Sequence, residues 1–194
     1  MARDTLRAMP ESAAETAGSG NADSPESVRL SFPSPLGSLG VEIHGETITR
    51  VVIVPKGRER SIFVPLGDLK PAQRSDFIEE VVGRFSEYFA GARKRLDIDS
   101  DLRAVEADGF SRRVLKNVAR IPYGRTRTYQ DLALAVGRPD GYRQVLAVLM
   151  TNPLPVVVPC HRVVPSKAGA GSYIAGTKKK QWLLKLESRG VELS

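Results

Sequence analysis

Cysteine is scarce in this sequence: its 194 residues include only Cys160. A single cysteine cannot form a disulfide within the chain, so we expect a fold that does not depend on an oxidising compartment. A lone cysteine is either a small buried apolar residue or a nucleophile, and its neighbours must distinguish the two. One cysteine and two scattered histidines form no metal-binding pattern, and no nucleotide-binding loop occurs, so we expect neither a metal nor a cofactor.

Long apolar segments are absent as well. No stretch approaches the roughly 18 apolar residues that span a bilayer, and the first residues, MARDTLRAMPESAAE, lack the apolar run of a signal peptide. We therefore expect an intracellular protein without membrane contact, in the cytoplasm with the nucleoid of a prokaryote or in the nucleus of a eukaryote. Residues 1–27, rich in Ala, Ser, Glu and Gly, are expected to be a disordered tail.

Positive charge is concentrated in the second half of the chain. The net charge is +7, but residues 103–194 hold 16 Lys and Arg against 6 Asp and Glu, a balance of +10, which leaves −3 for residues 1–102. Such asymmetry favours a polyanionic partner for the second half, with nucleic acid as the first candidate. A solubilising charged surface is the alternative.

Residues 28–102 have the pattern of a small α+β domain. Apolar residues alternate with Gly and Glu over 39–43, and a second apolar run, 48–54, follows the Gly45-Glu46 turn, which predicts an antiparallel hairpin. A helix that ends near Gly91 is predicted by an apolar stripe at four-residue spacing, formed by Phe77, Val81, Phe85 and Phe89. His44, beside the hairpin turn, is expected on the surface with no catalytic role.

Residues 103–194 are predicted to be mainly helical. One apolar face over 110–121 predicts a helix that stops at Tyr123-Gly124, and Thr128 with Asp131 forms an acidic capping box for a short helix that closes at Gly137. Residues 138–141 predict a turn, and 142–150 contain no helix breaker. A helix-turn-helix in the basic half suits DNA, whereas an ordinary helical hairpin is the simpler alternative.

The residues around the cysteine favour a nucleophile. Val156, Val157 and Val158 predict a short buried strand that ends at Pro159, and Cys160, His161 and Arg162 follow at once. A neighbouring imidazole and guanidinium are expected to favour the thiolate, the form of cysteine that attacks carbon. Adjacent residues of an extended strand would point in opposite directions, so a turn or a bridging water is needed to let His161 act on the thiol.

The segment 152–164, NPLPVVVPCHRVV, resembles the active-site segment of the O6-alkylguanine-DNA alkyltransferases, also called methylated-DNA–protein-cysteine methyltransferases. The resemblance extends from about Ile121 to Glu187, and more loosely to the first domain. It implies an α+β fold, with a small N-terminal antiparallel sheet-and-helix domain at 28–102 and a helical domain at 103–194 that contains a winged-helix-like helix-turn-helix. It also implies that no cofactor is used.

The same resemblance implies roles for five residues of the reaction centre. Cys160 would accept the alkyl group, His161 would be the base that reaches it through water, and Glu187 would orient the histidine. Tyr173, in the 171–176 loop that resembles the wall of the substrate pocket, would lie near the lesion oxygen. Asn152 would hold the active-site turn.

Four further residues are implied to contact DNA. Arg143 would enter the duplex and fill the gap left by the extruded nucleotide, Tyr129 would crowd the adjacent phosphate, and Thr128 and Arg162 would lie at the same interface. Two departures from the family stand out. Leu146 and Ala147 replace a usual Gly-Gly pair after the arginine, and Ile174-Ala175-Gly176 replaces the more usual Ser-Gly-Gly, which is expected to narrow the pocket.

The resemblance implies DNA repair by direct damage reversal. The chain would flip O6-alkylguanine out of double-stranded DNA and transfer the alkyl group irreversibly to Cys160, once per molecule, acting as a monomer; activity on O4-alkylthymine is left open. Two alternatives remain. A non-enzymatic lesion-binding relative would lack the acceptor cysteine, and in a plain helix-turn-helix regulator the cysteine would be incidental.

Overall fold

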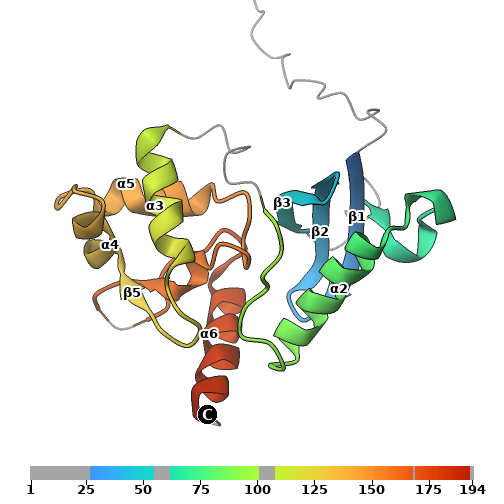
Figure 1. Ribbon diagram of the computed structural model, residues 1–194. Helices are drawn as coiled ribbons and strands as arrows, with labels where there is room; N and C mark the ends of the chain where they lie inside the picture. Colours follow the sequence, from blue (N-terminus) through green and yellow to red (C-terminus); the bar gives the residue numbers. More distant parts are fainter. Residues whose placement is uncertain (1–26, 55–61, 101–107, 168, 193–194) are drawn as a thin grey trace, which may run out of the picture.

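The computed structural model describes residues 27–54, 62–100, 108–167 and 169–192 (Figure 1). The predicted tail, residues 1–27, lies outside these ranges except for its last residue, and the predicted boundary between residues 102 and 103 lies outside them too. The architecture combines a small sheet with several helices, so the predicted α+β class is confirmed. None of the helices described is long and apolar enough to cross a membrane.

The first half is built on a four-stranded sheet with the strand order β3-β2-β1-β4. β1 (Ser27–Ser34) and β2 (Gly37–His44) are antiparallel, and β2 continues through the predicted Gly45-Glu46 turn into β3 (Thr47–Ile53). Gly45 has φ +57°, a left-handed conformation that glycine adopts without steric penalty. The short β4 (Val64–Pro65) lies parallel to β1 and leads into two 3-10 turns, η1 (Leu66–Asp68) and η2 (Pro71–Gln73).

Helix α2 (Asp76–Phe89) packs against this sheet, as the apolar spacing predicts (Figure 1). Ser75 caps it by accepting a hydrogen bond from the Ile78 amide, and the chain leaves it at Gly91, with φ +77°. Its buried face consists of Ile78, Val81, Phe85, Tyr88 and Phe89. Phe77 of the predicted stripe is only partly buried.

The second half contains the remaining helices. α3 (Gly109–Ala119) ends two residues before Ile121, slightly earlier than predicted. β5 (Arg127–Thr128) precedes α4 (Tyr129–Ala135), and both hydrogen bonds of the Thr128–Asp131 capping box are present. A turn then leads to α5 (Tyr142–Met150), which confirms the second predicted helix. The 3-10 turn η3 (Cys160–Arg162), β6 (Val163–Val164) and α6 (Thr177–Glu192) complete the chain.

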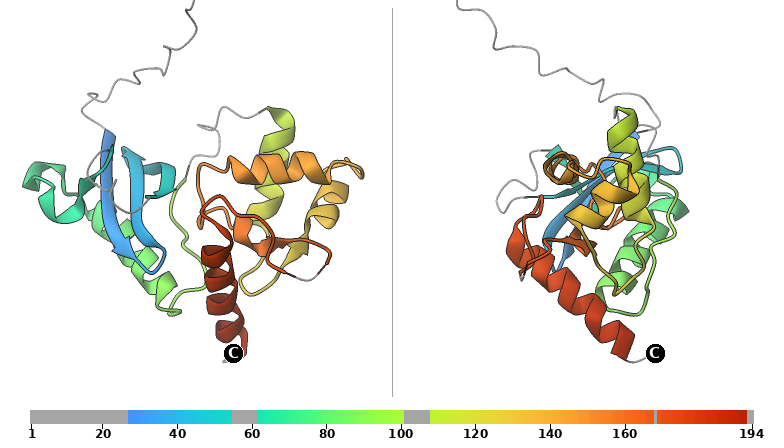
Figure 2. Two further views of the ribbon diagram at one scale, coloured as in Figure 1. Left: turned by 180° about the vertical axis from the view of Figure 1, so that it is seen from behind. Right: turned by 90° about the vertical axis from the view of Figure 1, so that its left-hand side faces the viewer.

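The two halves meet along β3 and α6. The Val51 amide of β3 donates to the Pro153 carbonyl of the segment before the cysteine, with N and O 2.8 Å apart. Phe89 of α2 lies against Trp182 of α6, with ring centroids 6.1 Å apart. The left view of Figure 2 shows α6, in red, between the two halves. Buried apolar residues from both halves form one continuous core, so the cysteine segment is packed from both sides.

Candidate active site

A tight turn, rather than the predicted strand, precedes the cysteine. Residues 156–158 form no strand; a single bridge joins Pro155 to Val158, and Val156 has φ +76°. A left-handed conformation is unfavourable for a β-branched residue, so the surroundings must hold it. Asn152 does so: its Nδ2 donates to the Val158 carbonyl (3.0 Å), and its Oδ1 accepts from the Leu154 amide (3.0 Å).

After the turn, Cys160 lies in the protein interior as the first residue of η3. The residue is 2% exposed, and Asn152 Nδ2 donates to its Sγ at 3.1 Å. Burial raises the pKa of the thiol to about 11, while the Asn152 hydrogen bond and the positive charge of Lys180 act in the opposite direction. The expectation that His161 and Arg162 favour the thiolate is therefore wrong for this structure, because the guanidinium of Arg162 forms an ion pair with another residue.

That partner is Glu187, a buried carboxylate on α6 that is 1% exposed. Its oxygens accept hydrogen bonds from Tyr88 Oη (2.5 Å), the Gly124 amide (3.0 Å) and the Arg162 guanidinium (2.8–3.1 Å), and they lie 2.9 Å from His161 Nε2. Burial alone would raise the pKa of Glu187, but the hydrogen bonds from His161 and Arg162 outweigh it and lower the pKa to about 2. Glu187 is thus ionised at neutral pH.

An ionised Glu187 determines the tautomer of His161. Because the carboxylate can only accept, Nε2 of the imidazole carries the proton, and Nδ1 presents a lone pair. Burial lowers the pKa of His161, although Glu187 works against this, so the imidazole is the neutral, proton-accepting form. Nδ1 has no hydrogen-bond partner within the described residues. In η3, successive side chains are separated by about 120°, so His161 and Cys160 avoid the opposed directions of a strand.

Arg162 does not lie where the sequence interpretation placed it. We expected it at a DNA interface, but it is 7% exposed and also donates to the Ile121 carbonyl, with Nη1 2.6 Å from the oxygen. Its guanidinium lies over the ring of Tyr123, 5.8 Å from the centroid. Arg162 is therefore the counterion of Glu187 within the core, which removes it from the DNA-contacting set.

Tyr173 and the 171–176 loop border the same site. The ring of Tyr173 meets that of His161 edge to face, with centroids 6.4 Å apart, and its hydroxyl is buried without a hydrogen-bond partner in the described part of the chain. Burial raises the pKa of this hydroxyl well above its usual value, so it stays protonated and can donate. Ile174 is exposed at the outer side of the loop.

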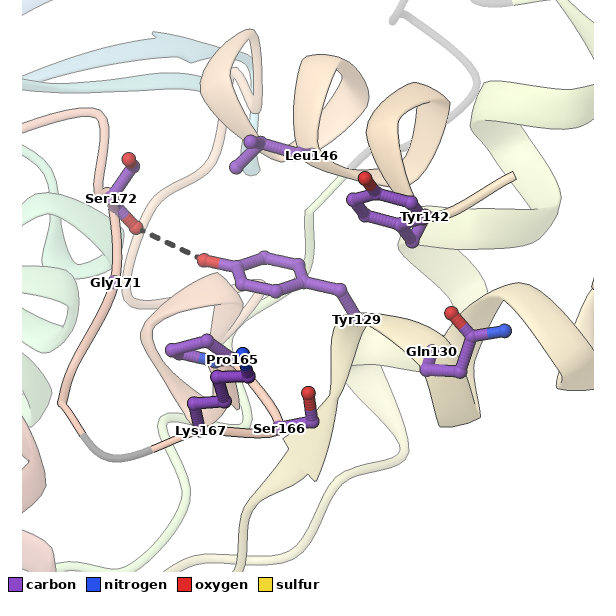
Figure 3. Close-up of a pocket in the computed structure, with 9 residues that line it drawn as sticks. All are labelled: Tyr129, Gln130, Tyr142, Leu146, Pro165, Ser166, Lys167, Gly171 and Ser172. Carbon is purple, nitrogen blue, oxygen red and sulfur yellow. Dashed lines mark hydrogen bonds between the residues drawn. The ribbon is translucent and has the colours of Figure 1, made fainter. Parts of the chain in front are cut away.

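The helix pair α4–α5 borders a cavity of about 570 Å³ (Figure 3). Tyr129, Tyr142 and Leu146 line one side of it, and Pro165, Gly171 and Ser172 line another. Tyr129 donates to the Ser172 carbonyl at 3.4 Å, so it bridges the cavity wall to the loop. Cys160 is not among the lining residues.

The residues expected to contact DNA lie at the start of these two helices. Arg143 is exposed at the first turn of α5, where its Nε donates to Tyr142 Oη at 3.1 Å, and Thr128 is the N-cap of α4. Leu146, which replaces a usual glycine, is half-buried against the cavity, whereas Ala147 is exposed.

Two residues of the site were missed by the sequence interpretation: Tyr88 of α2 and Lys180 of α6. Lys180 is completely buried, and its Nζ donates to the Val163 carbonyl (2.5 Å), the Ser172 carbonyl (3.0 Å) and Tyr129 Oη (3.2 Å). Burial lowers its pKa to about 8. Helical spacing could have found both residues. Tyr88 lies seven positions after Val81, on the face already assigned to the core, and Lys180 lies seven positions before Glu187, on the same side of the last helix.

Comparisons with known proteins identify the family to which the chain is related. The family model "6-O-methylguanine DNA methyltransferase, DNA binding domain" matches residues 109–189. A probable methylated-DNA–protein-cysteine methyltransferase of Acanthamoeba polyphaga mimivirus is 33% identical over 151 residues, 77% of this chain and 90% of that protein. The methylated-DNA–protein-cysteine methyltransferase of Mycobacterium tuberculosis is 33% identical over 156 residues, 79% and 88% of the two chains.

Comparison with solved structures also finds methyltransferases that act on O6-methylguanine. The crystal structure of Mycobacterium tuberculosis O6-methylguanine methyltransferase has a TM-score of 0.70 and 30% identity, and the match covers 84% of this chain and 93% of that one. A structure of the same mycobacterial protein in complex with DNA matches equally well. The fold, the Pro-Cys-His-Arg turn and these relatives together show that the chain belongs to the methylated-DNA–protein-cysteine methyltransferase family.

Proposed function

We propose that this protein repairs DNA by transferring an alkyl group from O6 of guanine in double-stranded DNA to Sγ of Cys160. The observation that carries the proposal is the arrangement around the only cysteine of the chain. Asn152 fixes the turn and donates to the sulfur, and a neutral His161 next to it is oriented by the ionised Glu187. A structural cysteine would need none of these groups.

The raised pKa of Cys160 makes His161 necessary. A thiol with a pKa of about 11 is ionised in about one molecule in ten thousand at pH 7. The proton must therefore leave during the reaction, and we assign it to Nδ1 of His161, through a water molecule. Sulfur then forms a bond to the alkyl carbon as the bond from that carbon to guanine O6 breaks, and the electron pair leaves with guanine. Tyr173, a protonated hydroxyl, would donate to the departing oxygen.

We further propose that α4 and α5 are the DNA-binding helix-turn-helix of a winged-helix-like domain formed by residues 103–194, next to a sheet-and-helix domain formed by residues 28–102. O6 and its alkyl group lie inside the stacked duplex, so the nucleotide must be flipped out at a cost of a few kcal/mol. Arg143 is exposed at the start of α5, where it can enter the duplex and stack in place of the base. Tyr129 and Thr128 would face the neighbouring phosphates.

The cavity between these helices and the loop is the proposed entrance for the flipped base. Its aromatic and apolar lining suits stacking on a purine. Since Cys160 does not line the cavity and is only 2% exposed, the wall of the cavity has to move for the alkyl carbon to reach the sulfur. Leu146, which lines the cavity in place of a usual glycine, narrows this path, which favours small alkyl groups.

Mass spectrometry tests the proposal against its two alternatives. After incubation with a duplex that contains O6-methylguanine, peptide mapping should find one added methyl group on Cys160, and the yield should level off at one methyl per protein because a thioether is not reversed by any group of this site. Cys160→Ala should bind the same duplex without transfer. A lesion-binding protein or a plain regulator would leave Cys160 unmodified.

A further inference from the structure

Tyr88 reaches the active-site carboxylate from the other half of the molecule. It is part of α2, outside the residues 109–189 that the family model matches, and its side chain is 1% exposed. Its hydroxyl oxygen lies 2.5 Å from Glu187 Oε1 and 3.5 Å from His161 Nε2. The first half of the chain thus contributes a polar group to the site.

The direction of the hydrogen bond is fixed by the chemistry of the pair. A carboxylate can only accept, so the Tyr88 hydroxyl is the donor. Burial and the charge of Glu187 raise the pKa of Tyr88, which keeps this donor protonated at every pH at which the protein works. The accepting atom, Oε1, is the one that lies 2.9 Å from His161 Nε2, so Tyr88 and His161 share one oxygen.

We propose that Tyr88 is a positioning residue for the transfer reaction: its hydroxyl holds Glu187 Oε1 in the orientation that keeps the His161 proton on Nε2 and its Nδ1 ready to accept the proton of Cys160. The inference rests on the proposed function. It gives the first half of the chain a part in the chemistry, in addition to its role in packing.

Loss of the Tyr88 hydroxyl has a definite electrostatic consequence. Without this donor, the negative charge on Glu187 Oε1 is less compensated. It therefore stabilises the protonated form of His161 more strongly, and the pKa of His161 rises. A protonated imidazole cannot accept the thiol proton, so the acid limb of the transfer rate must move to higher pH. The other titratable or charged side chains that face this pair are Cys160 and Arg162 from η3, Tyr123 from the segment after α3, Tyr173 from the loop and Lys180 from α6.

The chain offers a clean spectroscopic test because it contains two histidines, His161 and the exposed His44. In protein labelled with ¹⁵N-histidine, the ring signals of His161 should show the Nε2–H tautomer, with His44 as the internal reference. In Tyr88→Phe the titration of His161 should move up by about half to one pH unit, and the acid limb of single-turnover transfer should move with it. Tyr123→Phe is the matched control, because its hydroxyl donates to the Leu186 carbonyl and not to Glu187.

A His161 titration in Tyr88→Phe that superimposes on that of the parent would overturn the inference, as would an equal shift in Tyr123→Phe. If Tyr88→Phe does not fold, hydrogen exchange in the unsubstituted protein provides the test. The Tyr88 hydroxyl proton should exchange slowly with solvent, and exchange as fast as that of an exposed tyrosine would overturn the inference. Absence of methyl transfer by the parent would refute the proposed function, yet the His161 titrations would still report on Tyr88.

Discussion

The side-chain amide of Asn152 donates a hydrogen bond to the sulfur of Cys160, with Nδ2 and Sγ 3.1 Å apart. The same amide donates to the Val158 carbonyl, so one side chain both closes the turn and contacts the nucleophile. Such a donor stabilises the thiolate more than the thiol, because a negatively charged acceptor forms the stronger hydrogen bond.

Asn152→Ala should therefore lower both stability and thiol reactivity. It leaves the buried Leu154 amide without its acceptor, which should cost about 1–3 kcal/mol of unfolding free energy. It also removes one of the two hydrogen bonds to the Val158 carbonyl, which still accepts from the Cys160 amide. The pKa of Cys160 should rise further. Urea denaturation and the rate of alkylation by iodoacetamide measure the two effects. Asn117→Ala, which removes an exposed bond to the Arg113 carbonyl on α3, is the control and should change neither by much.

The reactivity of Cys160 in the free protein should depend steeply on pH. Because burial raises its pKa to about 11, the thiolate fraction, and hence the alkylation rate, should rise about tenfold for each pH unit between pH 7 and pH 10. Since Cys160 is the only cysteine, total thiol modification reports on it directly. N-acetylcysteine in the same buffers is the reference. A rate already constant from pH 6 upward would mean that the thiolate is preformed, contrary to this expectation.

Glu187→Gln should destabilise the protein strongly at neutral pH. The variant leaves the buried Arg162 without its counterion, which should lower the free energy of unfolding by about 3–5 kcal/mol. Methyl transfer should fall as well, because an amide no longer fixes the His161 tautomer. Glu80→Gln, which removes an exposed ion pair with Arg84 within α2, should change the unfolding free energy by less than about 1 kcal/mol.

The same carboxylate should make the stability of the parent sensitive to acid. The folded pKa of Glu187, about 2, lies below its ordinary value of 4.5, so its contribution is present above pH 4.5 and is lost as the pH falls toward 2. This amounts to about 3 kcal/mol, judged from the two pKa values. Urea titrations from pH 7 to pH 2 should show the parent converging on Glu187→Gln. If the unfolding free energies of the parent and of Glu187→Gln instead fall in parallel with pH, groups other than Glu187 cause the acid sensitivity.

Arg143→Ala should impair repair of duplex DNA far more than reaction with a free base. Transfer from O6-methylguanine in a duplex needs extrusion of the nucleotide, which we propose that Arg143 assists, and we expect a loss of about ten- to a hundredfold in rate. Transfer from the free base O6-benzylguanine needs no extrusion and should change little. Arg95→Ala in the first half, which removes one exposed charge, controls for net charge. Equal losses on both substrates would give Arg143 a structural role.

The sequence by itself determined the local elements and the chemistry of the cysteine segment. The stripe from Val81 to Phe89 and the Thr128–Asp131 cap predict α2 and the start of α4, because helical periodicity and capping act between residues a few positions apart. Likewise, the Pro-Cys-His-Arg motif and its resemblance pointed to Cys160, His161 and Glu187, and the structure brings His161 and Glu187 within hydrogen-bond distance.

Only the tertiary structure decided the partners of these residues. Tyr88 and Glu187 are separated by 99 positions. The sequence predicts Arg162 at the DNA interface, whereas in the structure it is buried and donates to Glu187. The predicted strand at Val156 failed for a similar reason: β-branched residues favour a strand locally, but Asn152, together with the packing of β3 against Pro153, imposes a turn. Local propensities amount to a fraction of a kcal/mol per residue, whereas a buried charge or an unpaired amide costs several times more, so long-range contacts set the final geometry of the site.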